Sequence, residues 1–195
     1  MFDEKKQLRK LLRSQRRSLS PAEVIAKGRL IAERLRPFPP FQQTRTLVLY
    51  SANENEVQTE TIWQEAAAQG KAVYYPRITA DRANLEFVRR YPGERLIPGT
   101  FGILIPSGED LLSGLRKTDV VLTPGVGFDR QGHRLGRGKG YYDRAFQGVL
   151  SEGLRVALAY EFQIIAYIPA VAHDEKVQYI VTEVELIDCS DKNAL

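Results

Sequence analysis

Residues 119–143 read DVVLTPGVGFDRQGHRLGRGKGYYD and join three local signals. The stretch opens with an apolar, β-branched run, which is typical of a buried strand. A loop with six glycines follows, at positions 125, 127, 132, 136, 138 and 140, and the residues from Gly140 onward indicate a helix. The loop also carries four cations, which are Arg130, Arg134, Arg137 and Lys139. A strand, a glycine-rich cationic loop and a helix N-terminus together favour phosphate binding, because backbone N–H groups, the helix dipole and the cations all attract an anion.

This loop matches neither of the two common nucleotide-binding motifs. A Walker loop requires Ser or Thr after its lysine, but Gly140 follows Lys139, and His133 stands where the first glycine is needed. A dinucleotide-binding loop would need glycine in place of Tyr141. A flexible basic surface loop is the alternative, since glycine clusters often indicate no more. The combination of six glycines, four cations and the Tyr-Tyr-Asp ending favours the phosphate-binding interpretation.

Composition predicts a single globular, soluble domain that spans residues 1–195, with 43% hydrophobic and 27% charged residues. No apolar run approaches the roughly 18 residues of a membrane span, and the charged N-terminus does not resemble a secretion signal. The single Cys189 fits a reducing compartment, so we expect a cytoplasmic protein. One cysteine and two histidines, His133 and His173, argue against a zinc site.

Positive charge is concentrated at the N-terminus. Residues 1–17 hold seven of the 28 Lys and Arg residues and two of the 24 acids, so the rest of the chain has a net charge of −1. This distribution argues against a broad nucleic-acid-binding face. Residues 3–18 form a predicted amphipathic helix on which Lys5, Arg9 and Arg13 stand four apart. That row is either a solvated face or a contact to a polyanion, such as a triphosphate, held near the glycine-rich loop.

The remaining elements alternate between helix and strand. We expect helices at 21–35, 59–69 and 140–151, with Ser20 and Thr59 as caps of the first two, and a short helix at 162–167. Further strands are expected at 46–50, 71–76, 85–88, 155–160 and 179–182, with an irregular segment at 93–114. This alternation of helices and strands predicts an α/β fold of three layers with a mostly parallel sheet. Glu56 then follows a strand at the sheet edge where such folds bind ligands, although a loop glutamate often has no such role.

Two carboxylates are candidates for a magnesium site. Asp143 lies one turn inside the helix after the loop, where a carboxylate beside polyphosphate is best explained by a shared Mg²⁺, and Asp174 could supply a second ligand. The alternative for Asp143 is an ion pair with Arg144 or Arg137. The adjacent Tyr141 and Tyr142 offer flat faces for a planar ligand or for core packing. The chain has no nucleophile–histidine–acid pattern, which favours an ATP-dependent ligase or kinase over a hydrolase.

The sequence resembles the 5-formyltetrahydrofolate cyclo-ligase family over nearly its whole length. The strongest match is RLGRGKGYYD at 134–143, supported by PGVGFD at 124–129 and KKQLR at 5–9. Weaker matches are Glu56 with Thr59, Pro76 with Arg77, and the block from His173 to Glu183. The sequence departs from the family at Ile105, Val171 and Gln178, where the family usually or often has an acid.

This resemblance implies a fold like that of the sugar-phosphate isomerase and CoA-transferase group. It implies an ATP-dependent conversion of 5-formyltetrahydrofolate to 5,10-methenyltetrahydrofolate, in which Lys139 and Arg137 neutralise the transferring phosphoryl group. The ATP-binding residues implied are Lys5, Arg9, Arg134, Leu135, Gly136, Arg137, Gly138, Lys139, Gly140, Tyr141 and Tyr142. The folate-binding residues implied are Glu56, Arg137, Gly138, Lys139, Gly140 and Tyr141. Asp143 and Asp174 are implied as Mg²⁺ ligands.

Two other functions are weighed against this one. A sugar-phosphate isomerase of related fold would bind phosphate in the same loop without using ATP. A protein that binds nucleic acid through its basic helix would have an affinity for RNA or DNA that depends steeply on salt concentration. We expect small-molecule partners only, a folate and ATP, with no nucleic acid and no membrane, and a monomer or weak homo-oligomer.

Overall fold

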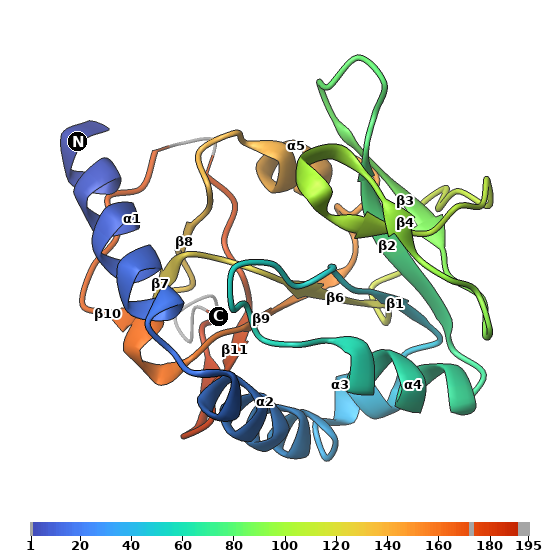
Figure 1. Cartoon of the computed structure of the whole chain (residues 1–195), viewed down its shortest axis with the longest axis horizontal. Helices are drawn as coiled ribbons and strands as arrows, with labels where there is room; N and C mark the ends of the chain where they lie inside the picture. Colours follow the sequence, from blue (N-terminus) through green and yellow to red (C-terminus); the bar gives the residue numbers. More distant parts are fainter. Residues whose placement is uncertain (1, 172–173, 191–195) are drawn as a thin grey trace.

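A seven-stranded sheet forms the centre of the molecule (Figure 1). The computed structural model describes residues 2–171 and 174–190, so His173 lies outside the described residues. The sheet has the order β12-β11-β9-β6-β1-β2-β3. Its strands are β1 (Thr46–Val48), β2 (Ala72–Ile78), β3 (Leu85–Arg89), β6 (Val120–Thr123), β9 (Leu154–Leu158), β11 (Tyr179–Val181) and β12 (Leu186–Asp188). The five inner strands are parallel and the two edge strands antiparallel, which confirms the predicted mostly parallel sheet.

Helices cover both faces of this sheet, as predicted. Along the lower side of Figure 1 lie α2 (Pro21–Leu35), α3 (Pro39–Gln43) and α4 (Glu60–Ala68), whose side chains Ile31 and Trp63 join the core with Leu47 and Leu122. On the upper side, α5 (Tyr141–Gln147) packs Phe146 against the other face. Within the described part of the chain, no helix is both long and apolar enough to cross a membrane.

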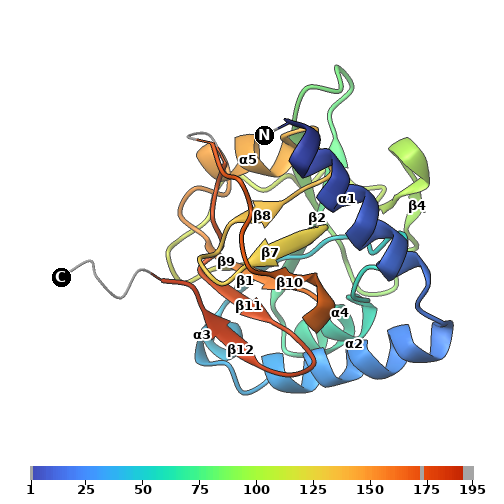
Figure 2. The ribbon, with the colours of Figure 1, turned by 90° about the vertical axis from the view of Figure 1, so that its left-hand side faces the viewer.

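A second, three-stranded sheet lies beside α1 (Phe2–Arg17) (Figure 2). Its strands are β7 (Gly127–Asp129), β8 (Arg134–Leu135) and β10 (Ile164–Ile165), in the order β10-β7-β8. Leu12 of α1 packs against Val126 and Leu135, and it lies so close to Gly127 that an added Cβ there would come within 2.6 Å of the Leu12 Cδ1 atom. The small sheet is therefore the surface on which α1 rests.

Three local predictions are wrong. The segment between β6 and α5 is not one continuous loop, because its first half forms the β7–β8 hairpin. The helix expected at 162–167 is only a 3₁₀ turn at Glu161–Gln163, after which Ile164 and Ile165 pair with β7. Thr59 does not cap α4 with its side chain, since its hydroxyl donates to the Tyr50 carbonyl at 2.6 Å.

Other predicted element boundaries agree more closely with the structure. The capping box of Ser20 and Glu23 at the start of α2 is confirmed. Helix α5 begins as expected but ends at Gln147, earlier than the predicted 151. The segment predicted to be irregular contains only short pieces, which are β4 (Ile97–Pro98), a 3₁₀ turn at Thr100–Gly102 and β5 (Leu104–Ile105).

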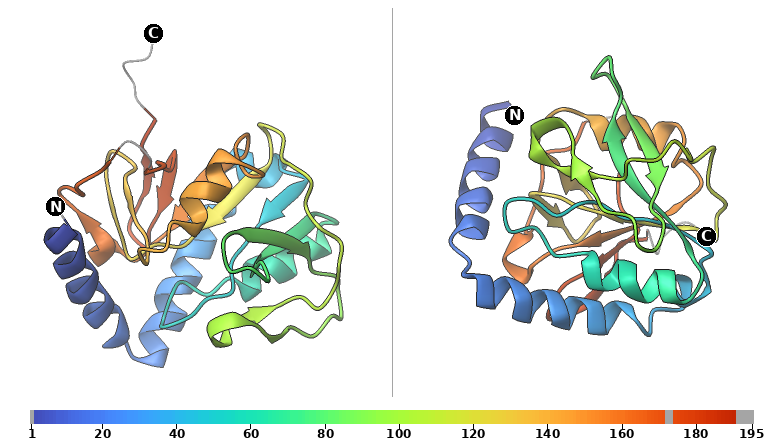
Figure 3. Two further views of the ribbon diagram at one scale, coloured as in Figure 1. Left: turned by 90° about the horizontal axis from the view of Figure 1, so that it is seen from above. Right: turned by 45° about the vertical axis from the view of Figure 1, so that its right-hand side comes forward.

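The strand order creates a ligand-binding position at the centre of the sheet. Strands β1 and β6 are neighbours, with Leu47 opposite Val120, but the chain leaves β1 toward β2 on one side and β6 toward β9 on the other. Open parallel sheets bind ligands at such a switch point, outside the carboxyl ends of the strands. Helix α1 and the β2–β3 hairpin stand on opposite sides of the molecule (Figure 3).

The loop after β1 contains residues with left-handed backbone conformations, and it contacts α1 through hydrogen bonds and ion pairs. Glu54 and Asn55 both have left-handed backbone conformations, with φ of 52° and 58°. The Asn55 side chain donates to the carbonyls of Arg16 (3.2 Å) and Leu19 (3.0 Å), and the Glu54 carboxylate accepts from Arg13 (2.8 Å) and from Arg17. Although partial burial opposes it, these ion pairs lower the pKa of Glu54 to about 2.

We predict that Glu54→Gln lowers the free energy of unfolding at neutral pH. We also predict that this free energy then falls less steeply as the pH is lowered. The pKa of Glu54 lies below its ordinary value of 4.5 in the folded protein, so its stabilisation is complete above that value and is lost as the pH falls toward 2. The shift corresponds to at most about 3 kcal/mol. Urea unfolding at pH 7 and pH 3 tests this, and an equal loss at both values would contradict it. Glu109→Gln removes a carboxylate that is 82% exposed and should cost less than about 1 kcal/mol.

Candidate active site

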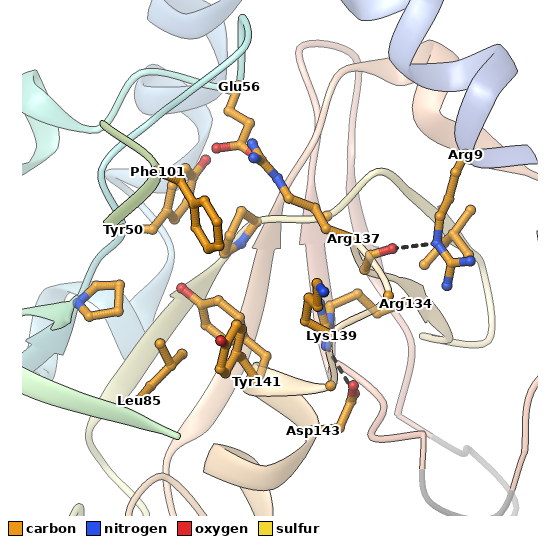
Figure 4. A pocket seen from close by; sticks show the side chains of 18 of the residues that line it. Arg9, Tyr50, Glu56, Leu85, Phe101, Arg134, Arg137, Lys139, Tyr141 and Asp143 are labelled. Carbon is orange, nitrogen blue, oxygen red and sulfur yellow. Dashed lines mark hydrogen bonds and ion pairs between the residues drawn. The ribbon is translucent and has the colours of Figure 1, made fainter. Parts of the chain in front are cut away.

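A cavity of about 1080 Å³ opens at the switch point of the sheet (Figure 4). Tyr50 and Ser51, which follow β1, and Pro124 and Gly125, which follow β6, line it. Its remaining walls come from α1, Glu56, the β2–β3 hairpin, the 97–105 segment, residues 134–143, and Val171 with Asp174. The cavity thus lies where the parallel sheet predicts a ligand site.

Six cations from two distant parts of the sequence line one side of the cavity. Helix α1 provides three of them and the segment from β8 to α5 the other three; they are Lys5, Lys6, Arg9, Arg134, Arg137 and Lys139. Of the cationic row of α1, Arg9 contacts the glycine-rich loop and Lys5 lines the same cavity, whereas Arg13 pairs with Glu54. Arg130 is not part of this cationic wall, because it lies on the β7–β8 hairpin and pairs with Glu185.

Most of these cations have a partner within the protein. The pairs are Lys5 Nζ to Asp174 Oδ2 (2.6 Å), Arg134 Nη2 to Asp143 Oδ1 (2.9 Å), Arg137 Nη2 to Glu56 Oε1 (2.8 Å), and Arg9 Nε to the Gly136 carbonyl (2.9 Å). The alternative prediction of an ion pair for Asp143 is right in kind but not in partner, since Arg134 takes the place of Arg144 or Arg137. Each pair joins segments that are distant in the chain or lie in different elements, so the charges also fix the shape of the cavity.

Lys139 differs from these cations. Its side chain is exposed at the cavity, and among the described residues it has no hydrogen-bond or ion-pair partner. It stands between Gly138 (φ 91°) and Gly140 (φ 67°), two left-handed positions that favour glycine. Arg144 donates to the Lys139 carbonyl at 3.1 Å, which holds the backbone while the ammonium group stays available. This arrangement is expected for a cation that is available to bind an anionic ligand.

The opposite wall of the cavity is apolar. It is built by Pro76, Ile78, Leu85, Phe101, Ile103 and Ile105. Phe101 is 68% exposed and has a left-handed backbone conformation (φ 60°). A cavity with one cationic and one apolar wall suits a ligand that has both a polyanionic and a planar apolar part.

The two adjacent tyrosines have different surroundings. Tyr141 reaches over the cavity and its hydroxyl donates to the Arg82 carbonyl at the tip of the β2–β3 hairpin (2.9 Å). Tyr142 packs beside Phe146, with ring centroids 5.8 Å apart, and shows only part of its ring to the cavity. Its hydroxyl is buried without a hydrogen-bond partner among the described residues, and burial raises the pKa of Tyr142 above its usual value.

Glu56 is a buried carboxylate at the cavity floor. It is 7% exposed, and its Oε2 atom accepts from the Asn53 backbone N–H at 3.0 Å. Its Oε1 atom accepts from Arg137 and lies 3.6 Å from Nη2 of Arg16. As predicted, Glu56 follows the first strand of the parallel sheet, and it lines the cavity.

The described residues contain no group of three or more His, Cys, Asp or Glu side chains that could hold a metal ion alone. Asp143 and Asp174 both line the cavity beside cations. Of the three departures from the family pattern, Ile105 and Val171 also line it. Gln178 does not, because its Oε1 atom accepts from the backbone N–H of Arg155 (2.9 Å) between β11 and β9.

Sequence reasoning missed several residues of the site. Lys6 lines the cavity, and the fully buried Arg16 lies beneath it. A signal for Arg16 exists, since Leu8, Leu12 and Arg16 are spaced by four and share one face of α1. A cation at the end of an apolar stripe is a candidate for a buried charge with specific partners.

The fold and the cavity together define an α/β protein with a cation-lined cavity at the switch point of a parallel sheet. A family model described as the 5-formyltetrahydrofolate cyclo-ligase family matches residues 2–183. The chain belongs to this family, which confirms the resemblance and the predicted enzyme class.

Individual relatives agree with this assignment. The chain is 32% identical to 5-formyltetrahydrofolate cyclo-ligase of Mus musculus, over 92% of this chain and 93% of the mouse protein. It is 30% identical to the enzyme of that name from Escherichia coli K12, over 88% and 96% of the two chains. The solution structure of Aquifex aeolicus 5,10-methenyltetrahydrofolate synthetase superposes with a TM-score of 0.84 at 30% identity, over 98% and 95%. These findings favour the cyclo-ligase over the sugar-phosphate isomerase.

We predict that Tyr142→Phe leaves stability unchanged or raises it by about 1 kcal/mol. The substitution removes a buried hydroxyl that has no partner, so the desolvation cost disappears and the packing of the ring remains. The matched control is Tyr50→Phe, which removes a buried hydroxyl that donates to the Val57 carbonyl at 2.9 Å and should cost about 1 kcal/mol. Urea unfolding of both variants tests the pair, and an equal loss in both would contradict the prediction.

Proposed function

We propose that this protein uses ATP to convert 5-formyltetrahydrofolate to 5,10-methenyltetrahydrofolate, with release of ADP and phosphate. Family membership supports the folate substrate and the ring closure. The observation that carries the use of ATP is Lys139, a cation without a partner among the described residues, held by left-handed glycines at the wall where five other cations gather.

The cationic wall is the proposed site of the ATP phosphates. Lys5 and Arg9 approach from α1, and residues 134–142 approach from the other side, where the backbone of the glycine-rich loop also offers N–H groups. The triphosphate would take over cations that now pair with carboxylates. In such an exchange each of these cations keeps an anionic partner, because a phosphate replaces a carboxylate.

The floor and the apolar wall are the proposed site of the folate. Glu56 and the loop residues 137–141 would contact its polar groups, with Tyr141 covering the planar ring system. Residues such as Leu85 and Phe101 would exclude water from the reacting atoms. Both substrates would then meet beside Arg137 and Lys139, which lie between Arg9 on one side and Leu85 and Phe101 on the other (Figure 4).

The proposed reaction needs no protein nucleophile. The formyl oxygen of the substrate attacks the γ-phosphorus of ATP, which forms an O–P bond and breaks the bond to ADP. The N10 nitrogen then attacks the activated formyl carbon and loses its proton, and departure of phosphate leaves the methenyl bridge. Lys139 and Arg137 would stabilise charge on the transferring phosphoryl group, a role that depends on positioned cations alone.

Magnesium is a proposed cofactor. Asp143 and Asp174 fit it, because Mg²⁺ bound to a nucleotide takes only one or two protein carboxylates and completes its shell with phosphate oxygens and water. When bound, the ion would add positive charge at the phosphates. We further propose a cytoplasmic enzyme, a monomer or weak homo-oligomer, that acts on small molecules and has no nucleic-acid partner.

A direct assay tests this function. Purified protein is mixed with 5-formyltetrahydrofolate, Mg²⁺ and ATP while the near-ultraviolet absorbance of the methenyl product is followed. We expect a rise that requires ATP and yields one ADP per product. A rise without ATP would contradict the proposed mechanism, and no rise in the complete mixture would contradict the function.

We predict that Lys139→Ala lowers kcat by about a hundredfold or more, because it removes a cation from the transferring phosphoryl group. Its exposed side chain contributes little packing, so the melting temperature should not change. Lys117→Ala, at an exposed lysine outside the cavity, is the matched control and should retain full activity. Normal turnover in Lys139→Ala would refute the phosphoryl role.

We predict that Asp143→Asn raises the Mg²⁺ concentration for half-maximal rate by about tenfold or more, since one anionic ligand is lost. A titration of the rate with Mg²⁺ at saturating ATP measures the effect. Asp110→Asn, at a carboxylate that does not line the cavity, should leave the titration unchanged. An unchanged midpoint in Asp143→Asn would show that Asp143 serves only to pair with Arg134.

A further inference from the structure

Arg16 is the most deeply buried cation beside the cavity. It is 1% exposed and lies near the end of α1, on the face that carries Leu12. Its Nε atom donates to the Glu54 carbonyl (3.0 Å) and its Nη1 atom to the Gly125 carbonyl (3.1 Å). One guanidinium group therefore links α1, the loop after β1 and the loop after β6.

The third nitrogen of Arg16 is not used in the same way. Nη2 is buried and makes no hydrogen bond to any described residue, but it lies 3.6 Å from Oε1 of Glu56 and 3.7 Å from Oε2 of Glu54. An unmade hydrogen bond on a buried donor carries a desolvation cost, so the orientation of Nη2 calls for an explanation. Burial lowers the pKa of Arg16, an effect that the carboxylates of Glu56 and Glu54 oppose.

The present partner of Glu56 has another proposed task. Arg137 holds Oε1 of Glu56 at 2.8 Å, yet under the proposed function the same guanidinium contacts the phosphates of ATP. If Arg137 turned away, Glu56 would be a buried carboxylate that has lost its hydrogen-bonded cation. Such a group is costly unless a second cation replaces the first.

The surroundings of Glu56 limit the choice of a second cation. Among the described residues, the cations within ion-pair distance are Arg137 and Arg16. The other titratable groups that face Glu56 are the carboxylate of Glu54 on the same loop and the hydroxyls of Tyr50, Tyr142 and Tyr160. None of these carries a positive charge.

We infer that Arg16 is a positioning residue, a permanent counter-ion that compensates the charge of Glu56 and holds it in place while Arg137 changes partners from Glu56 to a phosphate. This inference rests on the proposed function, because the change of partner requires ATP at the loop. In the structure, Arg137 donates to Glu56, and the Nη2 atom of Arg16 has no hydrogen-bond partner among the described residues. With ATP bound, Nη2 becomes the hydrogen-bond donor to Glu56.

The inference is tested by binding a non-hydrolysable ATP analogue with Mg²⁺ in calorimetry. The titration is repeated in two buffers of different ionisation enthalpy, which counts the protons taken up on binding. In Arg16→Gln we expect affinity to fall about tenfold or more, with uptake of about one proton beyond the wild-type value, because a carboxylate without a cation binds a proton instead. In the double variant Arg16→Gln/Glu56→Gln, the extra proton uptake should vanish and affinity should recover.

Controls separate this effect from a loss of structure. Arg90→Gln removes another buried arginine, which pairs with Glu60 away from the cavity, and should change neither affinity nor proton uptake. If Arg16→Gln does not fold, Arg16→Lys serves instead, because it keeps the charge but places it differently. This variant should bind the nucleotide more weakly than the wild-type protein does. Its proton uptake should exceed the wild-type value by less than one proton.

Each outcome decides the question. Wild-type affinity and proton count in the Arg16 variants would overturn the inference. Weaker binding without extra proton uptake, and without recovery in the double variant, would also overturn it, because it would show a structural role only. Failure of the wild-type protein to bind the nucleotide would overturn the proposed function itself and the inference with it.

Discussion

Charge balance in the cavity is the constraint on which the rest of the site depends. Six cations converge there from α1 and the glycine-rich loop, and in a concave site such cations repel one another. The fold holds them by placing carboxylates between them, as in the pairs of Lys5 with Asp174 and of Arg134 with Asp143. These pairs join parts of the chain up to 169 residues apart. The pairs that hold the cavity in shape are therefore also the ones that a polyanion would have to replace.

Much of this could be predicted from the sequence, because its signals are local. Apolar β-branched runs located the parallel strands, and the spacing of Lys5 and Arg9 placed two cations on one face of α1. The density of glycine and cations between 134 and 140 located one part of the cationic wall of the cavity. Each of these signals lies within one turn of helix or a few residues of strand, where side-chain spacing alone determines direction.

The features that could not be predicted depend on partners distant in the sequence. Strands β7, β8 and β10 have two or three residues each and show no alternation, so they exist because they pair with one another under α1. Arg130 looked like its neighbours in the glycine-rich loop, but the hairpin turns it toward Glu185. Arg16 had no predicted role, and its burial depends on the loops after β1 and β6, which supply its hydrogen-bond partners.

The glycine-rich stretch has two structural tasks, which its composition does not separate. Its first half forms the small sheet, where Gly127 allows Leu12 of α1 to pack against the backbone. Its second half carries Gly138 and Gly140, which set the direction of Lys139. Because Lys5 and Arg9 lie on the same helix as Leu12, the packing at Gly127 determines where these two cations stand relative to Lys139. One continuous stretch of sequence thus fixes both sides of the cationic wall, which explains why the helix and the loop can act on a single ligand.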